Sequence, residues 1–271
     1  MVTKCSAGSV RRFGLFAVWV LLMTASARAQ DQEEPVSQVA PAGQVAPLAP
    51  RWLAGTPPPP VETFSDGLVR HHVALTEPAL SAALRDPDGE VRSLAAAQLA
   101  SMDDHPALKK IVQAMQDERD PQVQVNLAGA ASWLGSRVGI AQLETICQDV
   151  NVPSTARLDA ARYVSNKQLA TCFPAVRQIA QADQDATIRV QAVIAAVSYR
   201  GQADGARMIA VKALKDVDPT VRITAADALR SLRATSEIGS LESALQGESD
   251  ETAREHLRDA ARVLRLDAAA K

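Results

Sequence analysis

The strongest constraint on the fold is a pair of residues that returns at a nearly fixed interval along most of the chain. The pair is usually Val, Ile or Ala followed by Arg, and successive second members are 32, 33, 32, 33 and 32 residues apart. A fixed period of this length is the signature of a repeat protein, in which each unit packs against its neighbours. The six pairs are Val91-Arg92, Val123-Gln124, Ala156-Arg157, Ile188-Arg189, Val221-Arg222 and Ala253-Arg254.

An acidic residue stands four positions before the second member of most pairs. These residues are Asp88, Asp120, Asp185, Asp218 and Asp250, and Pro153 takes the place in the third repeat. A carboxylate at this position accepts hydrogen bonds from the unpaired amides of a first helical turn. Proline follows two of the acids, at 121 and 219, and suits the first helical position because it has no amide to leave unpaired. The pattern predicts that a helix begins after each position.

Small and aliphatic residues recur one position before, three after and seven after the second member of each pair. This spacing places them on one face of a helix, where small side chains allow neighbouring helices to approach closely. The stripe consists of 91, 95 and 99; 123, 127 and 131; 156, 160 and 164; 188, 192 and 196; 221, 225 and 229; and 253, 257 and 261.

A second apolar helical stretch precedes each of these helices. The stretches cover residues 79–84, 108–115, 140–146, 176–180, 208–214 and 238–245. Aromatic residues make up only 3% of the chain, which disfavours a large β-sandwich or barrel. We therefore predict an all-α, right-handed α-solenoid of about six two-helix repeats over residues 77–271. The charges of the last helix, among them Arg258, Asp259 and Arg262, suit an end that no further repeat covers.

The segment Asp218-Pro219-Thr220-Val221-Arg222-Ile223-Thr224-Ala225-Ala226 resembles a HEAT repeat. More narrowly, the short Ala-rich units resemble the HEAT-like repeats of the phycobilisome-lyase type. The resemblance covers about residues 77–266 and implies that the Asp and Arg columns join repeats instead of binding a ligand. The family includes scaffolds, adaptors and a few enzymes alike, so the resemblance is specific for the fold and not for one function. Gln124 and Pro153 depart from the pattern, which predicts a local change of curvature there.

The first thirty residues predict export. Residues 1–29 combine an early basic region, an apolar core of eleven residues at 13–23 and a final Ala27-Arg28-Ala29, which is the layout of a cleaved signal peptide. An uncleaved membrane anchor is the alternative. Residues 30–62 are rich in Pro, Gln, Ala and Glu and indicate a disordered linker, with a proline-motif ligand as the alternative. Residues 63–76 are expected to cap the first repeat. A periplasmic or secreted protein without stable membrane insertion is predicted.

The net charge bears on the class of partner, and the cysteine content bears on disulfide bonding. Removal of residues 1–29 leaves 25 Lys and Arg against 31 Asp and Glu, which argues against a nucleic-acid partner. Cys147 and Cys172 then remain, and two cysteines are too few for a disulfide framework. An oxidising compartment makes a bond between them conceivable. Two unpaired, buried thiols are the favoured interpretation.

Catalytic patterns are nearly missing from the sequence. The histidines at 71, 72, 105 and 256 show no spacing of three or four residues, and none precedes a glutamate as in iron-binding HEAT-repeat enzymes. Neither a nucleophile-elbow motif nor a phosphate-binding glycine loop occurs. We therefore expect no metal, no cofactor and no enzyme activity. A lyase-like chromophore-attachment factor, or an accessory subunit of an envelope enzyme, is the alternative.

The favoured function is an exported scaffold that binds a protein partner along the solenoid surface. Positions two, five and nine after the second member of each pair fall on the face opposite the apolar stripe, and Trp133 stands out among them. An exposed Trp is a common source of binding energy. Asn126, Asp159 and Arg162 are predicted to surround it. The alternative is that Trp133 turns into the core. The partner, the oligomeric state and the choice between concave and convex faces stay open.

Overall fold

The computed structural model describes residues 62–270, so the predicted signal peptide and nearly all of the predicted linker lie outside the described residues. The chain divides into two units, and the boundary lies between His72 and Val73. The described part of the first unit holds helix α2 (Phe64–Arg70). Thr63 starts this helix with a capping box. The Thr63 hydroxyl accepts a hydrogen bond from the backbone amide of Asp66, and the Asp66 carboxylate accepts one from the backbone amide of Thr63. The predicted cap segment thus contains one short helix.

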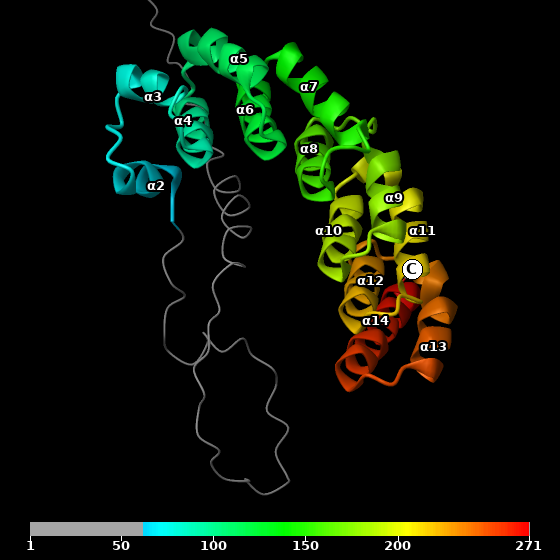
Figure 1. Cartoon of the computed structure of the whole chain (residues 1–271). Coiled ribbons are helices and arrows are strands. Elements are labelled where there is room, and N and C mark those ends of the chain that lie inside the picture. The colour runs from blue at the N-terminus through cyan, green and yellow to red at the C-terminus, as the bar shows by residue number, and fades with distance from the viewer. Residues whose placement is uncertain (1–61, 271) are drawn as a thin grey trace, which may run out of the picture. The chain divides into compact units, whose positions relative to one another are not determined.

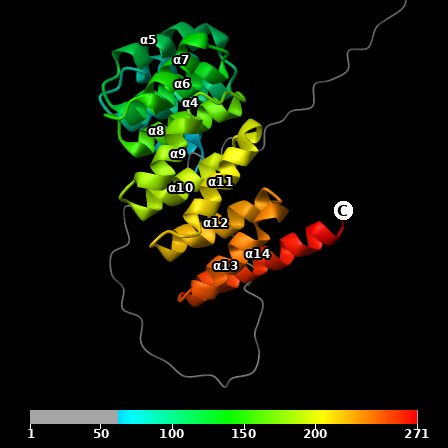
Figure 2. The same ribbon diagram turned by 90° about the vertical axis from the view of Figure 1, so that its right-hand side faces the viewer.

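The second unit is a curved stack of six helix pairs, which we number as repeats 1 to 6. In each pair the first member is called the A helix and the second the B helix. The A helices lie along the outer side of the curve and the B helices along the inner side (Figure 1; turned by 90° in Figure 2). The pairs are α3 (Glu77–Ala83) with α4 (Gly89–Ser101), α5 (Leu108–Asp117) with α6 (Pro121–Trp133), α7 (Arg137–Gln148) with α8 (Ser154–Asn166), α9 (Phe173–Ala182) with α10 (Ala186–Val197), α11 (Ala203–Ala213) with α12 (Pro219–Ser231), and α13 (Ile238–Gly247) with α14 (Glu251–Ala269).

This arrangement confirms the predicted solenoid of two-helix repeats. Short 3₁₀ turns lead into three of the A helices, at η4 (His105–Ala107), η5 (Arg200–Gln202) and η6 (Thr235–Glu237). Across residues 62–270 the regular structure is entirely helical. No helix in this range is long and apolar enough to cross a membrane.

The acidic column starts the B helices as predicted. In five repeats the N-cap is an Asp whose carboxylate accepts a backbone amide of the first turn, for example Asp218 from Thr220 at 2.7 Å. Asp120 accepts two such bonds, from Gln122 and Val123. The third B helix begins after Pro153 without a side-chain cap. The other three caps are Asp88, Asp185 and Asp250.

Four B helices end in a left-handed residue. Asp103, Gly135, Gln168 and Arg233 have φ values of 57°, 87°, 60° and 50°. The next amide then reaches back to a carbonyl of the last turn, as Leu169 does to Val164 at 3.3 Å. This is the Schellman arrangement, which reverses the chain so that the following A helix can begin. Glycine is present at only one of the four positions, so the other three carry a conformational cost.

The apolar stripe forms the core. Every predicted stripe residue is buried except Ile188, which is half-buried. Large side chains of the A helices meet the stripe from the other side, among them Leu80, Ile111, Leu143, Ile209 and Leu241. Because the B helices contribute mostly Ala and Val, the larger A-helix residues fill the volume between the two layers.

The interpretation of Cys147 and Cys172 as unpaired thiols is wrong. Both are buried, and their Sγ atoms lie 2.01 Å apart in a disulfide. Cys147 lies in the last turn of α7, and Cys172 is the N-cap residue of α9. The stacking of these neighbouring A helices brings the two Cα atoms to 5.7 Å, which suits a disulfide.

The core register gives a direct test at the start of α12. Val221, in the first turn of this helix, is fully buried, whereas Val217, in the turn before it, is 91% exposed. Val221→Asp buries an unpaired carboxylate and should lower the free energy of unfolding by about 4 kcal/mol. The matched control Val217→Asp should change it by less than about 0.5 kcal/mol. Denaturant unfolding followed by circular dichroism measures both, and equal effects would show that the register is wrong.

The helix ends give a second test. Gln168→Gly removes the cost of holding a residue with a side chain in the left-handed region, and should stabilise the protein by about 0.5–1 kcal/mol. Its neighbour Lys167 has a φ of −89°, so Lys167→Gly should destabilise instead. Thermal melting of both variants compares them, and a stabilised Lys167→Gly with an unchanged Gln168→Gly would contradict the assignment.

Candidate functional site

The Arg column joins each repeat to the next at three junctions. Arg92, Arg189 and Arg222 each donate through Nε and Nη2 to one carboxylate of the following repeat, namely Glu118, Asp216 and Glu248. The donor–acceptor distances are 2.6–2.8 Å. We call this arrangement the ionic clamp. Such two-pronged Arg–carboxylate pairs are the strong class of charged hydrogen bonds.

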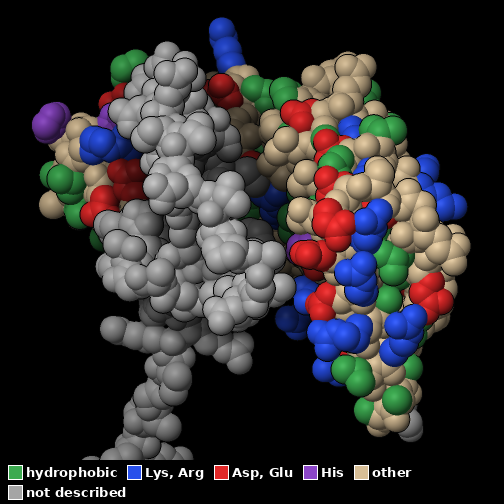
Figure 3. Space-filling view, turned by 90° about the horizontal axis from the view of Figure 1, so that it is seen from below, with side chains coloured by type: hydrophobic (Ala, Val, Ile, Leu, Met, Phe, Trp, Pro, Cys, Tyr) green, Lys and Arg blue, Asp and Glu red, His purple; other side chains and the backbone are tan. Residues whose placement is uncertain are grey.

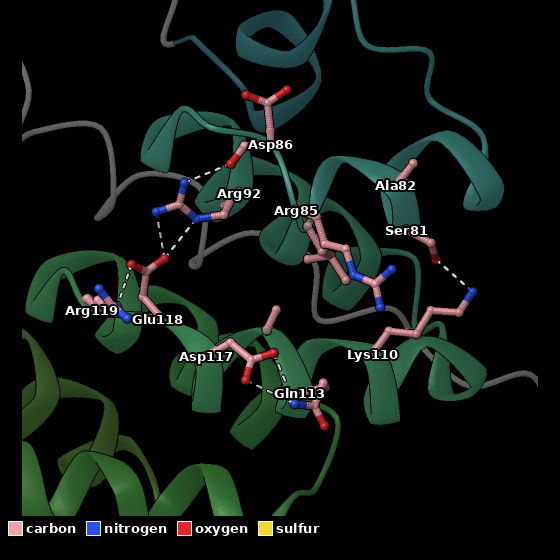
Figure 4. A pocket seen from close by; sticks show the side chains of 12 residues that line it. Ser81, Ala82, Arg85, Asp86, Arg92, Lys110, Gln113, Asp117, Glu118 and Arg119 are labelled. Carbon is pink, nitrogen blue, oxygen red and sulfur yellow. Dashed lines mark hydrogen bonds and ion pairs between the residues drawn. The ribbon is translucent and has the colours of Figure 1, made fainter.

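Each clamp also fixes the turn within its own repeat. Arg92 Nη1 donates to the carbonyls of Asp86 and Pro87 at 2.7 and 3.0 Å (Figure 4). Arg189 and Arg222 repeat this pattern with the carbonyls two and one residues before the N-cap. One guanidinium therefore holds its own A–B turn and the acid of the next repeat, which confirms the structural role that the resemblance implied.

The clamp acids form a second acidic column, which the sequence analysis missed. They stand two residues before the N-cap acids, and besides the clamp they accept the amide of the N-cap residue, as Glu248 does from Asp250 at 2.9 Å. The signal was the pattern acid-x-Asp, which occurs at 86–88, 118–120, 183–185, 216–218 and 248–250. The hydrogen bonds from Arg222 hold the pKa of Glu248 down at about 2, although burial opposes them.

The clamp is absent on both sides of repeat 3. Gln124 replaces Arg on one side and accepts a hydrogen bond from the Gln142 amide at 3.2 Å. On the other side Arg157 is buried and donates to the carbonyl of Cys147 at 3.1 Å and to Gln178 Oε1 at 3.3 Å, so neither acceptor is charged. Burial lowers the pKa of Arg157. The carboxylate in the clamp register, Asp183, accepts from Ser154 Oγ at 2.5 Å instead.

Two of the four predicted site residues belong to a half-buried polar network between the B helices α6 and α8, and a third makes a separate contact. Asp159 accepts from Arg162 Nη1 at 2.7 Å within α8 and from Gln122 Nε2 of α6 at 2.9 Å. Asn126 of α6 donates to Ser93 Oγ of α4 at 3.2 Å. The structure thus brings Asp159 and Arg162 together, whereas Asn126 bonds to the preceding repeat. Gln122 is a member that the sequence analysis did not identify.

The network lies beside a close contact of α6 with α8. A Cβ atom on Gly129 would lie 2.4 Å from the ring of Tyr163, so that ring covers the glycine. Gly129 is therefore buried, although it stands five positions after Gln124, on the face opposite the apolar stripe. Burial and the charge of Asp159 raise the pKa of Tyr163 to about 12. Burial also raises the pKa of Asp159, against the opposing effects of Arg162 and Gln122.

Trp133 is the exposed member of the predicted site. Its side chain is 48% exposed in the last turn of α6, so the alternative in which it turns into the core is wrong. It follows Gly129 by four residues, which is about one helical turn. Within the described residues, Arg162 Nε is buried without a hydrogen-bond partner. Gln122, the α6 partner of Asp159, precedes Trp133 by eleven residues, which is about 16 Å along the helix axis. Asp159 therefore pairs near the start of α6, whereas Trp133 lies at its end.

Charged pairs occupy the corresponding positions of the last two B helices. Asp227 of α12 contacts His256 Nδ1 at 3.3 Å, and Arg230 contacts Asp259 of α14 at 3.3 Å. Acidic and basic side chains are interspersed over the C-terminal repeats (Figure 3). Since these charges balance one another locally, this part of the surface lacks the single-signed field that would attract a strongly charged partner.

A hollow of about 510 Å³ opens between α3 and α5 of the first two repeats. Arg85, Lys110, Gln113 and Asp117 line it, and the clamp of Arg92 with Glu118 forms one edge (Figure 4). Lys110 already bonds to Glu77 and Ser81, and Asp117 to Gln113. The lining therefore mixes both charges, and it contains none of the predicted site residues. Elsewhere too, the described part of the chain shows no group of three His, Cys, Asp or Glu residues that could hold a metal ion.

Residues 76–164 match the family model of HEAT repeats. The matched part spans repeats 1 to 3 and supports the interpretation of the chain as a HEAT-repeat protein. A comparison with curated proteins gave no match.

The ionic clamp between Arg222 and Glu248 predicts that the free energy of unfolding depends on pH. Because the pKa of Glu248 is lowered from 4.5 to about 2, the clamp contributes its full stability above pH 4.5 and loses it as the pH falls toward 2. At pH 7, Glu248→Gln should lower the free energy of unfolding by about 2 kcal/mol. The difference from the wild type should shrink through the window below pH 4.5. The exposed Glu255 supplies the control Glu255→Gln, which should show neither effect. Urea unfolding at several pH values measures this, and a difference independent of pH would contradict it.

Proposed function

We propose that the chain is an exported, non-catalytic scaffold or adaptor that binds a protein partner on the inner side of its solenoid. The observation that carries the proposal is Trp133, a large aromatic side chain that is 48% exposed at the end of α6. A partner that covers this ring gains apolar burial at little cost in side-chain entropy, because Trp has only two rotatable torsions. The HEAT-repeat match supports an interaction surface of this kind.

The contacts between α6 and α8 support a binding surface on the same helix. Tyr163, Asp159 and Gln122 are held by packing and hydrogen bonds between α6 and α8, so the surface is preorganised before a partner arrives. Arg162, whose side chain is 20% exposed and is held by Asp159, supplies a positive charge to a carbonyl or carboxylate of the partner. The partner proposed here therefore presents an apolar side chain together with a hydrogen-bond acceptor.

Export to the periplasm or beyond is part of the proposal. The three-part leader at residues 1–29 supports it, and so does the Cys147–Cys172 bond, since disulfides persist mainly in oxidising compartments. Mass spectrometry of the protein recovered from a secreting host should find its N-terminus at Gln30. An intact Met1 on a cytosolic protein with two free thiols would contradict this part.

The narrower resemblance to repeats of the phycobilisome-lyase type is proposed as a likeness of repeat length and Ala content alone. Incubation of the purified chain with bilins should therefore leave no absorbance that survives denaturation. Covalently attached absorbance would favour the lyase-like alternative.

Trp133→Ala tests the binding site. It should weaken partner binding by about 2 kcal/mol, which is about thirtyfold in Kd, and should leave the melting temperature nearly unchanged. Met208, 60% exposed on the outer helix α11, provides the control Met208→Ala, which should bind as the wild type does. The partner is first recovered by cross-linking from the envelope fraction, and its affinity for the three chains is then measured by calorimetry. Equal affinities for all three would reject the site.

A further inference from the structure

The junction between repeats 3 and 4 is held differently from the others. At junctions 1–2, 4–5 and 5–6 an ionic clamp joins the two turns. Arg157 forms no ion pair with a carboxylate among the described residues, and its two acceptors, a carbonyl and an amide oxygen, are neutral. The strongest kind of link between repeats in this chain is therefore missing where α8 meets repeat 4.

A covalent link takes its place at the same junction. Cys147 lies in the last turn of the A helix of repeat 3, and Cys172, 25 positions later, is the N-cap of the A helix of repeat 4. Thr171 Oγ1, next to Cys172, donates to Glu144 Oε1 across the same gap at 2.6 Å. The carbonyl of Cys147 is also the acceptor of Arg157 Nε, so the disulfide and the unclamped arginine share a residue.

The disulfide connects to α8 through aromatic side chains. Phe173, directly after Cys172, meets Tyr199 edge to face with ring centroids 5.3 Å apart. Tyr199 Oη donates to the carbonyl of Ala161 in α8 at 2.7 Å. A Cβ atom on Gly205 would lie 2.6 Å from the Phe173 ring, so this ring has little room to move. The start of α9 is thus linked, through Phe173 and Tyr199, to the turn of α8 that contains Ala161 and Arg162.

The junction on the other side of repeat 3 needs no such link, because it is closed by backbone packing. A Cβ atom on Gly139 of α7 would lie 2.8 Å from the Ala128 carbonyl of α6, and Gly129 lies under Tyr163. Close approach of this kind supplies contact along both helices. Repeat 3 is thus joined to repeat 2 by packing and to repeat 4 by the disulfide.

We infer that the Cys147–Cys172 disulfide is the element that makes repeats 1–3 and repeats 4–6 one cooperative unit, in place of the missing clamp. In a solenoid the coupling between neighbouring repeats decides whether the stack unfolds together or in blocks. Reduction by a dithiol transfers two electrons and two protons to the bond, yields two thiols and converts the dithiol into its own disulfide. The junction then becomes the joint at which the stack separates. This role requires an oxidising compartment and so rests on the proposed export.

The oxidised and reduced forms of the same chain give the cleanest comparison, since they differ only in this bond. Both are prepared from the mature chain, residues 30–271, by refolding with and without a dithiol reductant, and amide hydrogen exchange is measured on each. Loss of the bond should reduce protection in α8 and α9 by about three hundredfold, the factor that a closed loop of this length supplies. Protection in α4 should change by less than about twofold. Thermal unfolding should change from one transition to two.

Cys147→Ala/Cys172→Ala should reproduce the reduced form, and Cys172→Ala alone should match it. Equal protection in α8 and α9 of the oxidised and reduced chains, with a single transition in both, would overturn the inference. If the double variant does not fold, the comparison of hydrogen exchange in the oxidised and reduced wild-type chains still tests the inference. Free thiols in protein isolated from the envelope would count against export only, because the exchange experiment uses chains oxidised in vitro.

Discussion

Each two-helix unit carries an apolar stripe that it cannot bury alone, and the whole stack depends on this constraint. The stripe is built mainly from Ala and Val, for example Ala225 beside Val221, so one pair of helices removes little apolar surface from water. Burial becomes substantial only when larger residues are added, such as Ile209 from the A helix of the same pair and Leu241 from the A helix of the neighbouring pair. Stability therefore resides at the junctions, and the features that vary between junctions decide how the molecule behaves.

The turns show why charged residues take part in this stacking. A clamp arginine satisfies two carbonyls of its own turn and one carboxylate of the next repeat, so polar groups at the end of a junction are paired with one another. The clamp acid in turn accepts the amide before the following B helix. Because the same acid starts a helix and receives the neighbour's arginine, the local signal for a helix start and the long-range contact between repeats coincide.

The periodic features could be read from the sequence, whereas the contacts between repeats could not. Helix starts at Asp120 or Asp218 depend on residues within one turn, and the stripe depends on a spacing of 3.6, so both were predicted correctly. The pairing of Cys147 with Cys172 depends on how the end of one A helix meets the start of the next, which no local pattern encodes. The same holds for Tyr163 on Gly129, where a position that helix geometry assigns to solvent is covered by the neighbouring helix.

The departures from regularity are gathered in the middle of the stack, and this concentration bears on function. All aromatic residues of Val73–Lys271, namely Trp133, Tyr163, Phe173 and Tyr199, lie between positions 133 and 199. The unclamped junctions, the uncapped helix after Pro153 and the disulfide lie in or beside the same segment. A perfectly regular stack presents the same surface at every repeat and offers a partner no preferred register. A partner of the proposed kind needs one place that differs from the rest, and the irregular repeats in the middle of the described stack, with regular repeats on either side, are where the proposed site lies.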